Sequence, residues 1–510
     1  MSELTPRELL PDLWMIEDTC NVYLVRDGNA AIAIDFGGGE WLGALPGLGI
    51  ETLEHVLLTH AHTEQCHGLS RHDSWPFTIH APGGEDTFLD PEKAGIFGPP
   101  PWFFMGCPLN YCPPPGRIAG VRYNIIGNGH MFWRGRRIRF MDTPGHGRNA
   151  CSIILDHADK QLVFCGDAAH AGGTVYQPFH LEWDHWTGEG ALAAWEGIVR
   201  LRGIAIDLLC PSHGPVIPDE PASMLNVLAE RLMSFYHAKG QVSPGEPDRY
   251  LPMEALDCGA YRCSEHLYQF GGNGYLLVSE TGEALVVDPF VADLGSLAEL
   301  LEELGHVTPT AMAVSHYHYD HCDGIPALRQ RFGAEAWLHP IVAEPIREPG
   351  SMFVPWLRPE PIEPDHLWPE EGAWQWNEYE FAITHWPGQT WWHCGFMAQI
   401  DGRKVFFAGD SFTPTSKWNG TGGFCAYNGS RFADGYVPSA RRVIEWQPEV
   451  MAAGHSNYYA FAQSKFEKVI EWAGWAAEAV RALCPSGDLE LDYHSVHEVV
   501  RRCSKVGAER

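Results

Sequence analysis

The chain repeats its own pattern at the scale of a domain. Residues 21–37 and 273–290 each predict a strand, a turn and a second strand that ends in an aspartate, Asp35 or Asp288. Apolar runs that break into histidines follow both stretches, as HVLLTHAH in the first half and AMAVSHYH in the second. A pattern that occurs twice indicates that the same fold occurs twice in the chain. In addition, a chain of 510 residues is longer than those that usually fold around a single hydrophobic core.

The spacing within the two copies is held almost residue for residue. His146 and Asp167 lie 21 positions apart (167 − 146), and the same interval separates Gln389 from Asp410 (410 − 389). Two sequences that otherwise differ so widely would not keep one register by chance. The spacing therefore indicates duplication of a single fold.

The boundary between the copies is predicted in residues 239–252, which are rich in Gly, Pro and charge. This stretch follows residues 222–238, whose apolar side chains recur at helical spacing. We therefore expect a first domain of residues 1–245 and a second domain of residues 253–510.

Each copy mixes short strands with helices. The strands are apolar and β-branched, which is typical of sheets buried on both faces. Residues 296–305 predict a helix that has a capping box, Ser296 with Glu299, and ends at Gly305. Strands mixed with helices indicate sheets covered by helices, an α/β layered architecture.

The composition limits the partners and the compartment. A net charge of −30 disfavours nucleic acid, because affinity for phosphates comes largely from Lys and Arg. No stretch has the roughly 18 uninterrupted apolar residues of a membrane span, and the N-terminus lacks the pattern of a signal peptide. The 14 cysteines are scattered singly, as expected of reduced thiols. We expect a cytoplasmic protein that acts on a small molecule; the sequence indicates no oligomeric state.

The stretch SHYHYDH, at the end of a predicted buried strand, is typical of a metal site. It supplies four ligand-type side chains: His316, His318, Asp320 and His321. Residues two apart on an extended chain point the same way, so His316 and His318 can hold one ion, and the Asp–His pair turns toward a second. Asp410 and His455 follow later strands at matching points. Imidazole together with carboxylate suits Zn²⁺, Fe or Mn.

The ordered series His-x-His-x-Asp-His, Pro-Gly-His, Gly-Asp and Gly-His resembles the metallo-β-lactamase superfamily, and the resemblance in each half covers that whole fold. The resemblance implies two tandem αββα sandwich domains of metallo-β-lactamase type. It also implies a site for one or two Zn²⁺ ions at one edge of the sheets in each domain. Members of the family mostly hydrolyse esters, thioesters, lactones, lactams, sulfates or phosphodiesters, so the motifs specify the fold more sharply than the substrate.

Carried onto the second half, the resemblance gives a nearly complete two-metal site. The first pocket and the bridging carboxylate are His316, His318, Gln389 and Asp410, and the second pocket is Asp320, His321 and His455. Gln389 stands where the family has the Pro-Gly-His histidine, and its amide oxygen is a weaker ligand. Residues 420–432 are expected to close over this site, with Arg431 meeting either an anionic group or a surface carboxylate.

The first half departs from the family in a complementary way. Its first pocket is complete and consists of His60, His62, His146 and Asp167, but its second pocket has Glu64 for Asp, Gln65 for His, and His213. We therefore expect a one-metal site here, or a decayed site kept as a scaffold. His67 stands where the family usually has a small residue; it could replace Gln65 as a ligand, but the expectation is a histidine on the surface.

The resemblance implies a hydrolase. The metal lowers the pKa of bound water and polarises the substrate carbonyl. Asp320 in the second half, or Glu64 in the first, would orient the hydroxide or take its proton. We favour the second half for this chemistry. By resemblance to glyoxalase II and lactonases, the expected substrate is an uncharged or modestly charged ester, thioester or lactone.

A different class of function also fits the first half. His60, His146 and Asp167 are two histidines and one carboxylate, the ligand set of non-haem Fe(II) oxygenases. Persulfide dioxygenases of the same superfamily use matching positions, so the first half is also compatible with iron and O₂ chemistry. A third possibility is a first half without catalysis that shapes the pocket of the second.

Overall fold

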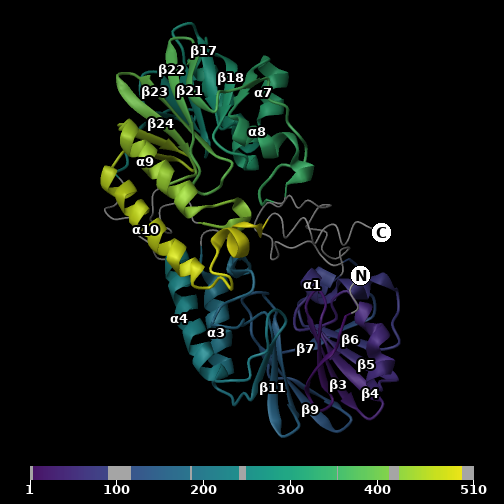
Figure 1. The fold of residues 1–510 in the computed structure, drawn as a ribbon. Helices are drawn as coiled ribbons and strands as arrows, with labels where there is room; N and C mark the ends of the chain where they lie inside the picture. Colours follow the sequence, from purple (N-terminus) through teal and green to yellow (C-terminus); the bar gives the residue numbers. More distant parts are fainter. Residues whose placement is uncertain are drawn as a thin grey trace.

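The described residues form four β-sheets, two in each half, with helices packed on their outer faces (Figure 1). The structure is a computed structural model that describes residues 4–89, 116–183, 187–240, 249–352, 354–412 and 424–496. Each half is an αββα sandwich, as the sequence predicts. No helix in these ranges is long and apolar enough to cross a membrane.

The first half contains a seven-stranded and a five-stranded sheet. The first sheet is ordered β1-β2-β3-β4-β5-β6-β7, and its strands are β1 (Arg7–Leu10), β2 (Leu13–Glu17), β3 (Asn21–Asp27), β4 (Ala30–Ile34), β5 (Thr52–Leu57), β6 (Thr78–Pro82) and β7 (Val121–Ile125). The second is ordered β12-β11-β10-β9-β8, and its strands are β8 (His130–Trp133), β9 (Arg136–Asp142), β10 (Cys151–His157), β11 (Lys160–Gly166) and β12 (Leu208–Pro211). Pairing is parallel from β4 to β7 and between β11 and β12.

Helices and short helical turns connect the strands of the first half. They are η1 (Glu40–Leu48), α1 (Thr63–Cys66), η2 (His67–Arg71), α2 (Asp86–Leu89), η3 (Pro178–Leu181), α3 (Glu189–Arg202) and α4 (Pro221–Gly240). The helix predicted over 222–238 is α4. Part of the boundary predicted in 239–252 lies outside the described residues.

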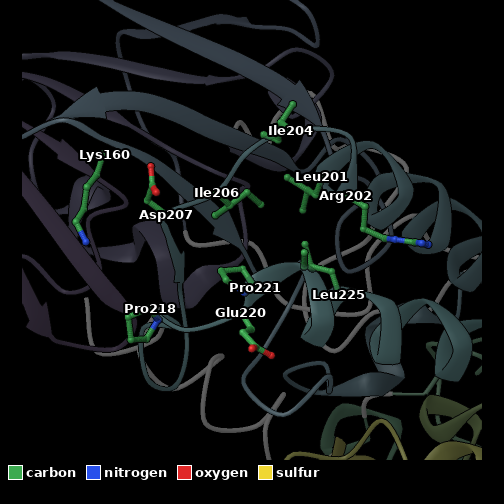
Figure 2. A pocket seen from close by; sticks show the side chains of 11 residues that line it. Lys160, Leu201, Arg202, Ile204, Ile206, Asp207, Pro218, Glu220, Pro221 and Leu225 are labelled. Atoms are coloured by element: carbon green, nitrogen blue, oxygen red, sulfur yellow. The ribbon is translucent and has the colours of Figure 1, made fainter.

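A pocket of about 420 Å³ opens between the start of β11, the end of α3 and the start of α4. Figure 2 shows Leu201, Ile206 and Leu225 in its lining, with Lys160 to one side. Lys160 begins β11, whereas Asp167 follows its other end. The pocket is therefore remote from the histidine clusters described below.

The central strands of each sandwich, such as β4 and β16, are buried on both faces. Alternate side chains point to opposite sides of a sheet, so one set meets the other sheet and the next set meets the helical layer. In β4, Ile32 and Ile34 pack between the two sheets against Ile138, while Ala31 and Ala33 pack under the outer helical layer. This explains the continuous apolar runs in the sequence.

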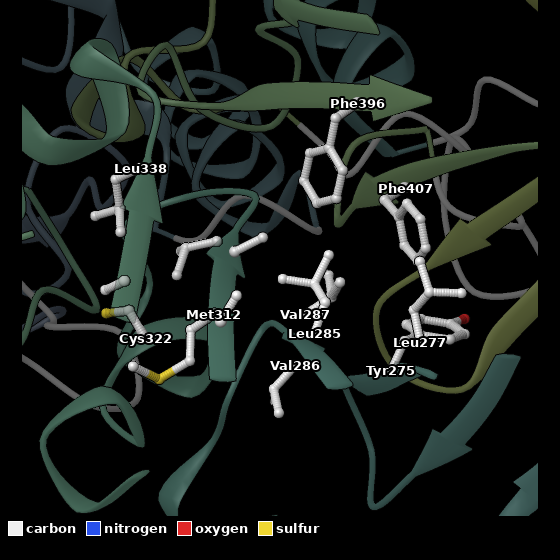
Figure 3. Packing of buried hydrophobic residues seen from close by; sticks show 14 of the residues in the cluster. Tyr275, Leu277, Leu285, Val286, Val287, Met312, Cys322, Leu338, Phe396 and Phe407 are labelled. Atoms are coloured by element: carbon white, nitrogen blue, oxygen red, sulfur yellow. The ribbon is translucent and has the colours of Figure 1, made fainter. Parts of the chain in front are cut away.

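The second half repeats this arrangement with eight and six strands. The larger sheet comprises β13 (Glu254–Ala255), β14 (Tyr261–Arg262), β15 (Leu267–Phe270), β16 (Gly274–Val278), β17 (Glu283–Val287), β18 (Thr308–Val314), β19 (Glu335–Leu338) and β20 (His366–Leu367). The smaller comprises β21 (Glu371–Trp376), β22 (Tyr379–His385), β23 (Cys394–Ile400), β24 (Arg403–Gly409), β25 (Val450–Ala453) and β26 (Asn457–Ala460). Figure 3 shows Val287 on the side of Phe396 and Phe407, between the sheets, and Val286 on the opposite side.

The helices and turns of the second half follow the same plan. They are η4 (Val291–Asp293), α5 (Leu294–Leu304), α6 (Tyr319–Cys322), α7 (Ile325–Phe332), α8 (Pro340–Arg347), η5 (Pro349–Ser351), η6 (Ala426–Asn428), η7 (Phe432–Tyr436), α9 (Val437–Trp446), α10 (Gln463–Arg481) and η8 (Glu490–His494). The predicted capping box is wrong: α5 begins at Leu294, directly after η4, so Ser296 already lies in its first turn, and the N-cap residue Asp293 makes no side-chain capping bond. The helix ends as predicted at Gly305, whose φ is 70°.

The two halves share one hydrophobic core along the seam between them. Helix α4 of the first half lies beside α10 of the second (Figure 1), and one apolar cluster includes Leu228 from the former and Trp472 from the latter. The indole N–H of Trp472 donates to the carbonyl of Ala238 over 3.0 Å. Separating the halves would expose this core to water, so the two sandwiches stabilise each other.

A buried ion pair lies in the same seam. Glu182 and Lys239, both from the first half and both without solvent exposure, approach to 3.8 Å. Lys239 donates to the carbonyl of Phe424, while the Glu182 carboxylate accepts from the amide of Ala426 over 2.7 Å and from the Tyr493 hydroxyl. The pair therefore ties the first half to two segments of the second.

Candidate metal centres

The histidines and carboxylates of the sequence motifs meet at the carboxyl ends of strands. In the first half, His60 follows β5, Asp167 follows β11 and His213 follows β12. The second half repeats this placement after β18, β24 and β25. Because these strands end at the same edge of the two sheets, residues far apart in sequence come together there.

A buried aspartate shapes the loop at the start of each motif. Asp35 and Asp288 adopt positive φ values of 57° and 51° directly after β4 and β17. The Asp35 carboxylate accepts from the amide and hydroxyl of Thr59 and from the Ser212 hydroxyl, and Asp288 accepts from the amide and hydroxyl of Ser315. Each aspartate thus fixes the backbone of the residue that precedes the first motif histidine.

The second-half centre has a buried first group of ligand atoms. His316, His318 and Asp410 each offer one ligand atom, and these atoms lie within 4.8 Å of one another. The Nε2 atom of His316 is buried and makes no hydrogen bond within the described residues, a situation that suits a metal ligand. Gln389 is buried on the loop after β22, where its backbone N–H donates to the Ser411 hydroxyl beside Asp410.

A second group of ligand atoms lies on the other side of Asp410. Asp320, His321 and His455 converge within 4.8 Å. His321 Nε2 is 3.3 Å from Asp410 Oδ1, and His455 Nε2 is 3.0 Å from Asp410 Oδ2. That second oxygen is also 3.9 Å from His316 Nε2, so Asp410 lies between the two groups in the position of a bridging ligand.

The charges of this centre favour a cation. Burial alone would raise the pKa of Asp410, but the imidazoles of His455 and His321 hold it well below its usual range. Burial alone would lower the pKa of His321, but three surrounding carboxylates, led by Asp410, raise it well above its usual range. Carboxylates gathered around buried imidazoles fit Zn²⁺ or a similar divalent ion, which would replace the proton on His321.

The first-half centre has one complete group. His60, His62 and His146 converge within 4.8 Å, with His62 Nδ1 only 3.0 Å from His146 Nε2. Asp167 Oδ2 lies 3.5 Å from His60 Nε2 and 3.6 Å from His146 Nε2. Burial lowers the pKa of His60 to about 3, so its imidazole is neutral, as a metal ligand must be.

The altered positions of the first half are occupied by hydrogen bonds within the protein. Gln65 Nε2 donates to Asp167 Oδ2 over 2.9 Å, on the side where His321 faces Asp410 in the other half. His213 turns its Nδ1 to Asp167 Oδ1 at 2.9 Å and its Nε2 to the carbonyl of Thr19 at 3.2 Å. Among the described residues, Glu64 and His213 join no converging group of ligand atoms.

Of the other side chains considered in the sequence, His67 differs from the expectation and Arg431 agrees with it. His67 is buried rather than exposed, because its Nδ1 faces the carbonyl of Thr63 at 3.0 Å within the first turn after the motif. Arg431 pairs with the surface carboxylate of Glu490 at 3.2 Å, which is one of its two expected roles. Of residues 420–432, the structure describes 424–432, and Asn428 of this part contacts His318 of the second centre.

Sequence reasoning missed His180 and Asn428. The His180 ring lies 4.4 Å from that of His62 and 4.5 Å from that of His146. Asn428 Oδ1 lies 3.0 Å from His318 Nε2. Neither belongs to a recognisable motif; a lone histidine in a Pro-Phe-His turn and an asparagine before glycine carry no metal-site signal on their own.

Comparison with known proteins agrees with this arrangement. The model of the metallo-beta-lactamase superfamily matches residues 15–213 and again residues 267–467. The chain belongs to this superfamily and carries its fold twice. No finer identity follows from a family of many activities.

Individual relatives are similar over parts of the chain. A hydroxyacylglutathione hydrolase of Albidiferax ferrireducens is 34% identical over 143 residues, which are 28% of this chain and 48% of the relative, so the match spans about half of that protein. Among solved structures, Rm3 metallo-beta-lactamase is 16% identical with a TM-score of 0.35, covering 46% of this chain and 94% of its own. A subclass B3 metallo-beta-lactamase of Bradyrhizobium japonicum is 14% identical with a TM-score of 0.33, covering 44% and 90%.

Proposed function

We propose that the protein is a metal-dependent hydrolase whose reaction takes place at the second-half centre. The observation that carries this proposal is the position of Asp410 between two converging groups of ligand atoms, His316 with His318 on one side and His321 with its partners on the other. Membership of the superfamily and the partial similarity to a hydroxyacylglutathione hydrolase support it. We propose Zn²⁺ as the ion, since imidazole and carboxylate ligands suit it; Fe or Mn would also fit.

The residues of the centre are proposed ligands, and one of them, Asp320, is also the proposed base. The ions would be held by His316, His318, Gln389, Asp410, Asp320, His321 and His455, and when bound they supply a hydroxide and polarise the substrate carbonyl. Asp320 is the proposed base, because its carboxylate is partly exposed and lies beside both His321 and His455. Asn273 Nδ2 donates to Asp320 Oδ2 over 3.0 Å, and Asn273 Oδ1 accepts from the amide of His455 over 2.8 Å. Asn273 thereby holds the base and one ligand in a fixed relation.

The two centres differ in their access to solvent. The His455 side chain is 56% exposed, whereas that of His213 is 13% exposed and stacks on the Tyr176 ring at 3.6 Å. A substrate can therefore reach the second-half centre past His455. We propose a small ester, thioester or lactone as the substrate, which also agrees with a net charge of −30 that opposes polyanions.

The first half is proposed to hold a single ion on His60, His62, His146 and Asp167. The Gln65 amide already donates to Asp167 where a second ion would bind, and Glu64 belongs to no converging group of ligand atoms among the described residues. Two imidazoles that face one carboxylate oxygen also fit Fe(II), so persulfide oxygenation stays the second candidate for this half.

The hydrolase proposal is tested on the full chain loaded with Zn²⁺. We expect turnover of at least one member of a panel of esters, glutathione thioesters and lactones, lost on chelation and restored by Zn²⁺. His316→Ala should lower kcat/KM by about 100-fold or more, because the loss of a ligand removes activated water. His366→Ala, a matched change at an exposed histidine, should leave it unchanged.

Two outcomes would reject this assignment. Zn²⁺-dependent turnover that His316→Ala leaves intact and His60→Ala abolishes would move the reaction to the first half. O₂ consumption with a persulfide that requires Fe(II) and His60, together with no hydrolysis of the panel, would replace the hydrolase with the oxygenase.

A further inference from the structure

The turn η6, Ala426–Asn428, connects the two metal centres. Tyr427 and Asn428 are neighbours in sequence and are almost completely buried. The Tyr427 hydroxyl lies 3.1 Å from Nδ1 of His180 in the first half, and Asn428 Oδ1 lies 3.0 Å from Nε2 of His318 in the second. Two adjacent side chains thus contact histidines that belong to different centres.

On the second-half side, Asn428 fixes the chemical form of His318. Its Nδ2 donates to the carbonyl of Gln389 over 3.1 Å, which identifies its other atom as the amide oxygen. That oxygen accepts from the Tyr317 hydroxyl and from His318 Nε2. Because an amide oxygen can only accept, His318 carries its proton on Nε2 and presents the lone pair of Nδ1 to the metal group.

On the first-half side, Tyr427 fixes His180. The Nε2 atom of His180 lies 3.1 Å from Oε1 of Gln177, which can only accept, so Nε2 carries the proton. In the neutral ring, Nδ1 of His180 therefore accepts from the Tyr427 hydroxyl. Held at both nitrogens, the ring packs directly against two histidines of the first centre, His62 and His146.

The turn itself is anchored to the first half although it comes from the second. The amide of Ala426 donates to the buried Glu182 carboxylate over 2.7 Å. Glu182 follows η3, the same turn that carries His180. The contacts of Tyr427 and Asn428 are therefore set by one rigid connection across the seam.

We propose that Tyr427 and Asn428 are positioning residues for the metal ligands of both centres, Asn428 by orienting His318 and Tyr427 by holding His180 against His62 and His146. The first centre is then incomplete without the second half of the chain. The inference rests on the proposed function only in taking both clusters as metal centres; it does not depend on hydrolysis.

The first test measures Zn²⁺ affinity at the second centre by competition with a chromophoric chelator. The full chain is used with His60→Ala and His62→Ala, so that only the second centre binds. We expect Asn428→Leu to weaken Zn²⁺ by about 10- to 100-fold, the usual effect of losing the partner of a ligand histidine. Asn428→Asp keeps an oxygen that accepts from His318 and should stay within about 3-fold of the parent. Equal affinities for the parent and Asn428→Leu would overturn the role of Asn428.

The second test measures the first centre in the full chain with His316→Ala and His321→Ala. Tyr427→Phe removes only the hydroxyl and should weaken Zn²⁺ there by about 3- to 10-fold, the effect of one hydrogen bond. Tyr379→Phe is the matched control, because the hydroxyl of this buried tyrosine donates to the carbonyl of Val278 within the second-half sandwich. Equal effects of the two variants at the first centre would overturn the proposal. Since no substrate is used, failure of the hydrolase assignment leaves both readouts interpretable.

Discussion

Replacing Asp320 or His321 with alanine is expected to lower kcat/KM for hydrolysis by about 100- to 10,000-fold, the range for loss of a general base. Asp320 is the proposed base, and His321 holds the second ion together with Asp410. The protein should stay folded, because Asp320 is partly exposed and neither residue belongs to a hydrophobic cluster. Steady-state kinetics and a thermal melt of each variant check the expectation.

A surface pair of the same residue types provides the control. His266 and Asp401 in the second half are bonded at 2.6 Å, and Glu265 completes a group with the composition of a metal site. His266→Ala and Asp401→Ala should leave kcat/KM unchanged. Native turnover in both Asp320→Ala and His321→Ala would show that the chemistry lies elsewhere.

Removing one partner of the buried ion pair in the seam is expected to have the largest effect on stability. Lys239→Met leaves the Glu182 carboxylate buried without its cation, which should lower the free energy of unfolding by about 3–5 kcal/mol. Urea denaturation of the full chain measures this loss. Glu182→Gln combined with Lys239→Met removes both charges and should recover part of it, because the Gln oxygen can still accept from the amide of Ala426 while its NH2 donates to the Tyr493 hydroxyl oxygen.

An exposed ion pair provides the comparison that measures the effect of burial on the free energy of unfolding. Arg134 and Glu54 lie 2.8 Å apart with side chains that are 40% and 30% exposed. Arg134→Met should lower the free energy of unfolding by less than about 1 kcal/mol. If Lys239→Met had no larger effect than Arg134→Met, the seam would not be held by the buried pair.

The shared core also determines which experiments are informative. A half expressed alone would expose the face of α4 or α10 that packs in the seam, and the first half would lose Tyr427 from His180. If an isolated half lost its metal, the cause could be either the missing contacts of the seam or weak binding at the site itself. Variants of the full chain separate the two centres without this difficulty.

The sequence predicted the fold and the centres because their signals are local and repeated. The aspartates after β4 and β17, the histidine pairs after β5 and β18, and the matched spacing to Asp167 and Asp410 each occur twice. Buried strands with apolar residues on both faces can also be recognised from their composition.

The features that sequence reasoning missed depend on contacts between distant segments. Tyr427 and His180 are 247 positions apart, and no periodicity links them. Residue type alone did not show that the Gln65 amide bonds Asp167, or that His67 turns back to its own helical turn. The capping box failed for a related reason, since the preceding turn η4 moved the start of α5 ahead of Ser296.

The complementary changes in the two halves make opposite predictions for substitution. In the second half, Gln389→His should strengthen metal binding, because imidazole is a better ligand for Zn²⁺ than an amide oxygen. In the first half, the double substitution Glu64→Asp and Gln65→His would create the Asp–His pair that the second half has. It would also remove the Gln65 amide that donates to Asp167. A second ion then gains ligands, although His213 must leave the Thr19 carbonyl to join them.

Metal content per chain tests the central claim most directly. The native protein and both variants are dialysed identically against Zn²⁺-buffered solution and measured by elemental analysis. We expect about three ions in the native chain, two in the second half and one in the first, since three ligand pockets are complete or nearly so. Gln389→His should retain its ions at lower free Zn²⁺, and Glu64→Asp with Gln65→His should raise the content toward four. Four tightly held ions in the native chain would show that Glu64 and Gln65 serve a full site and would contradict the account.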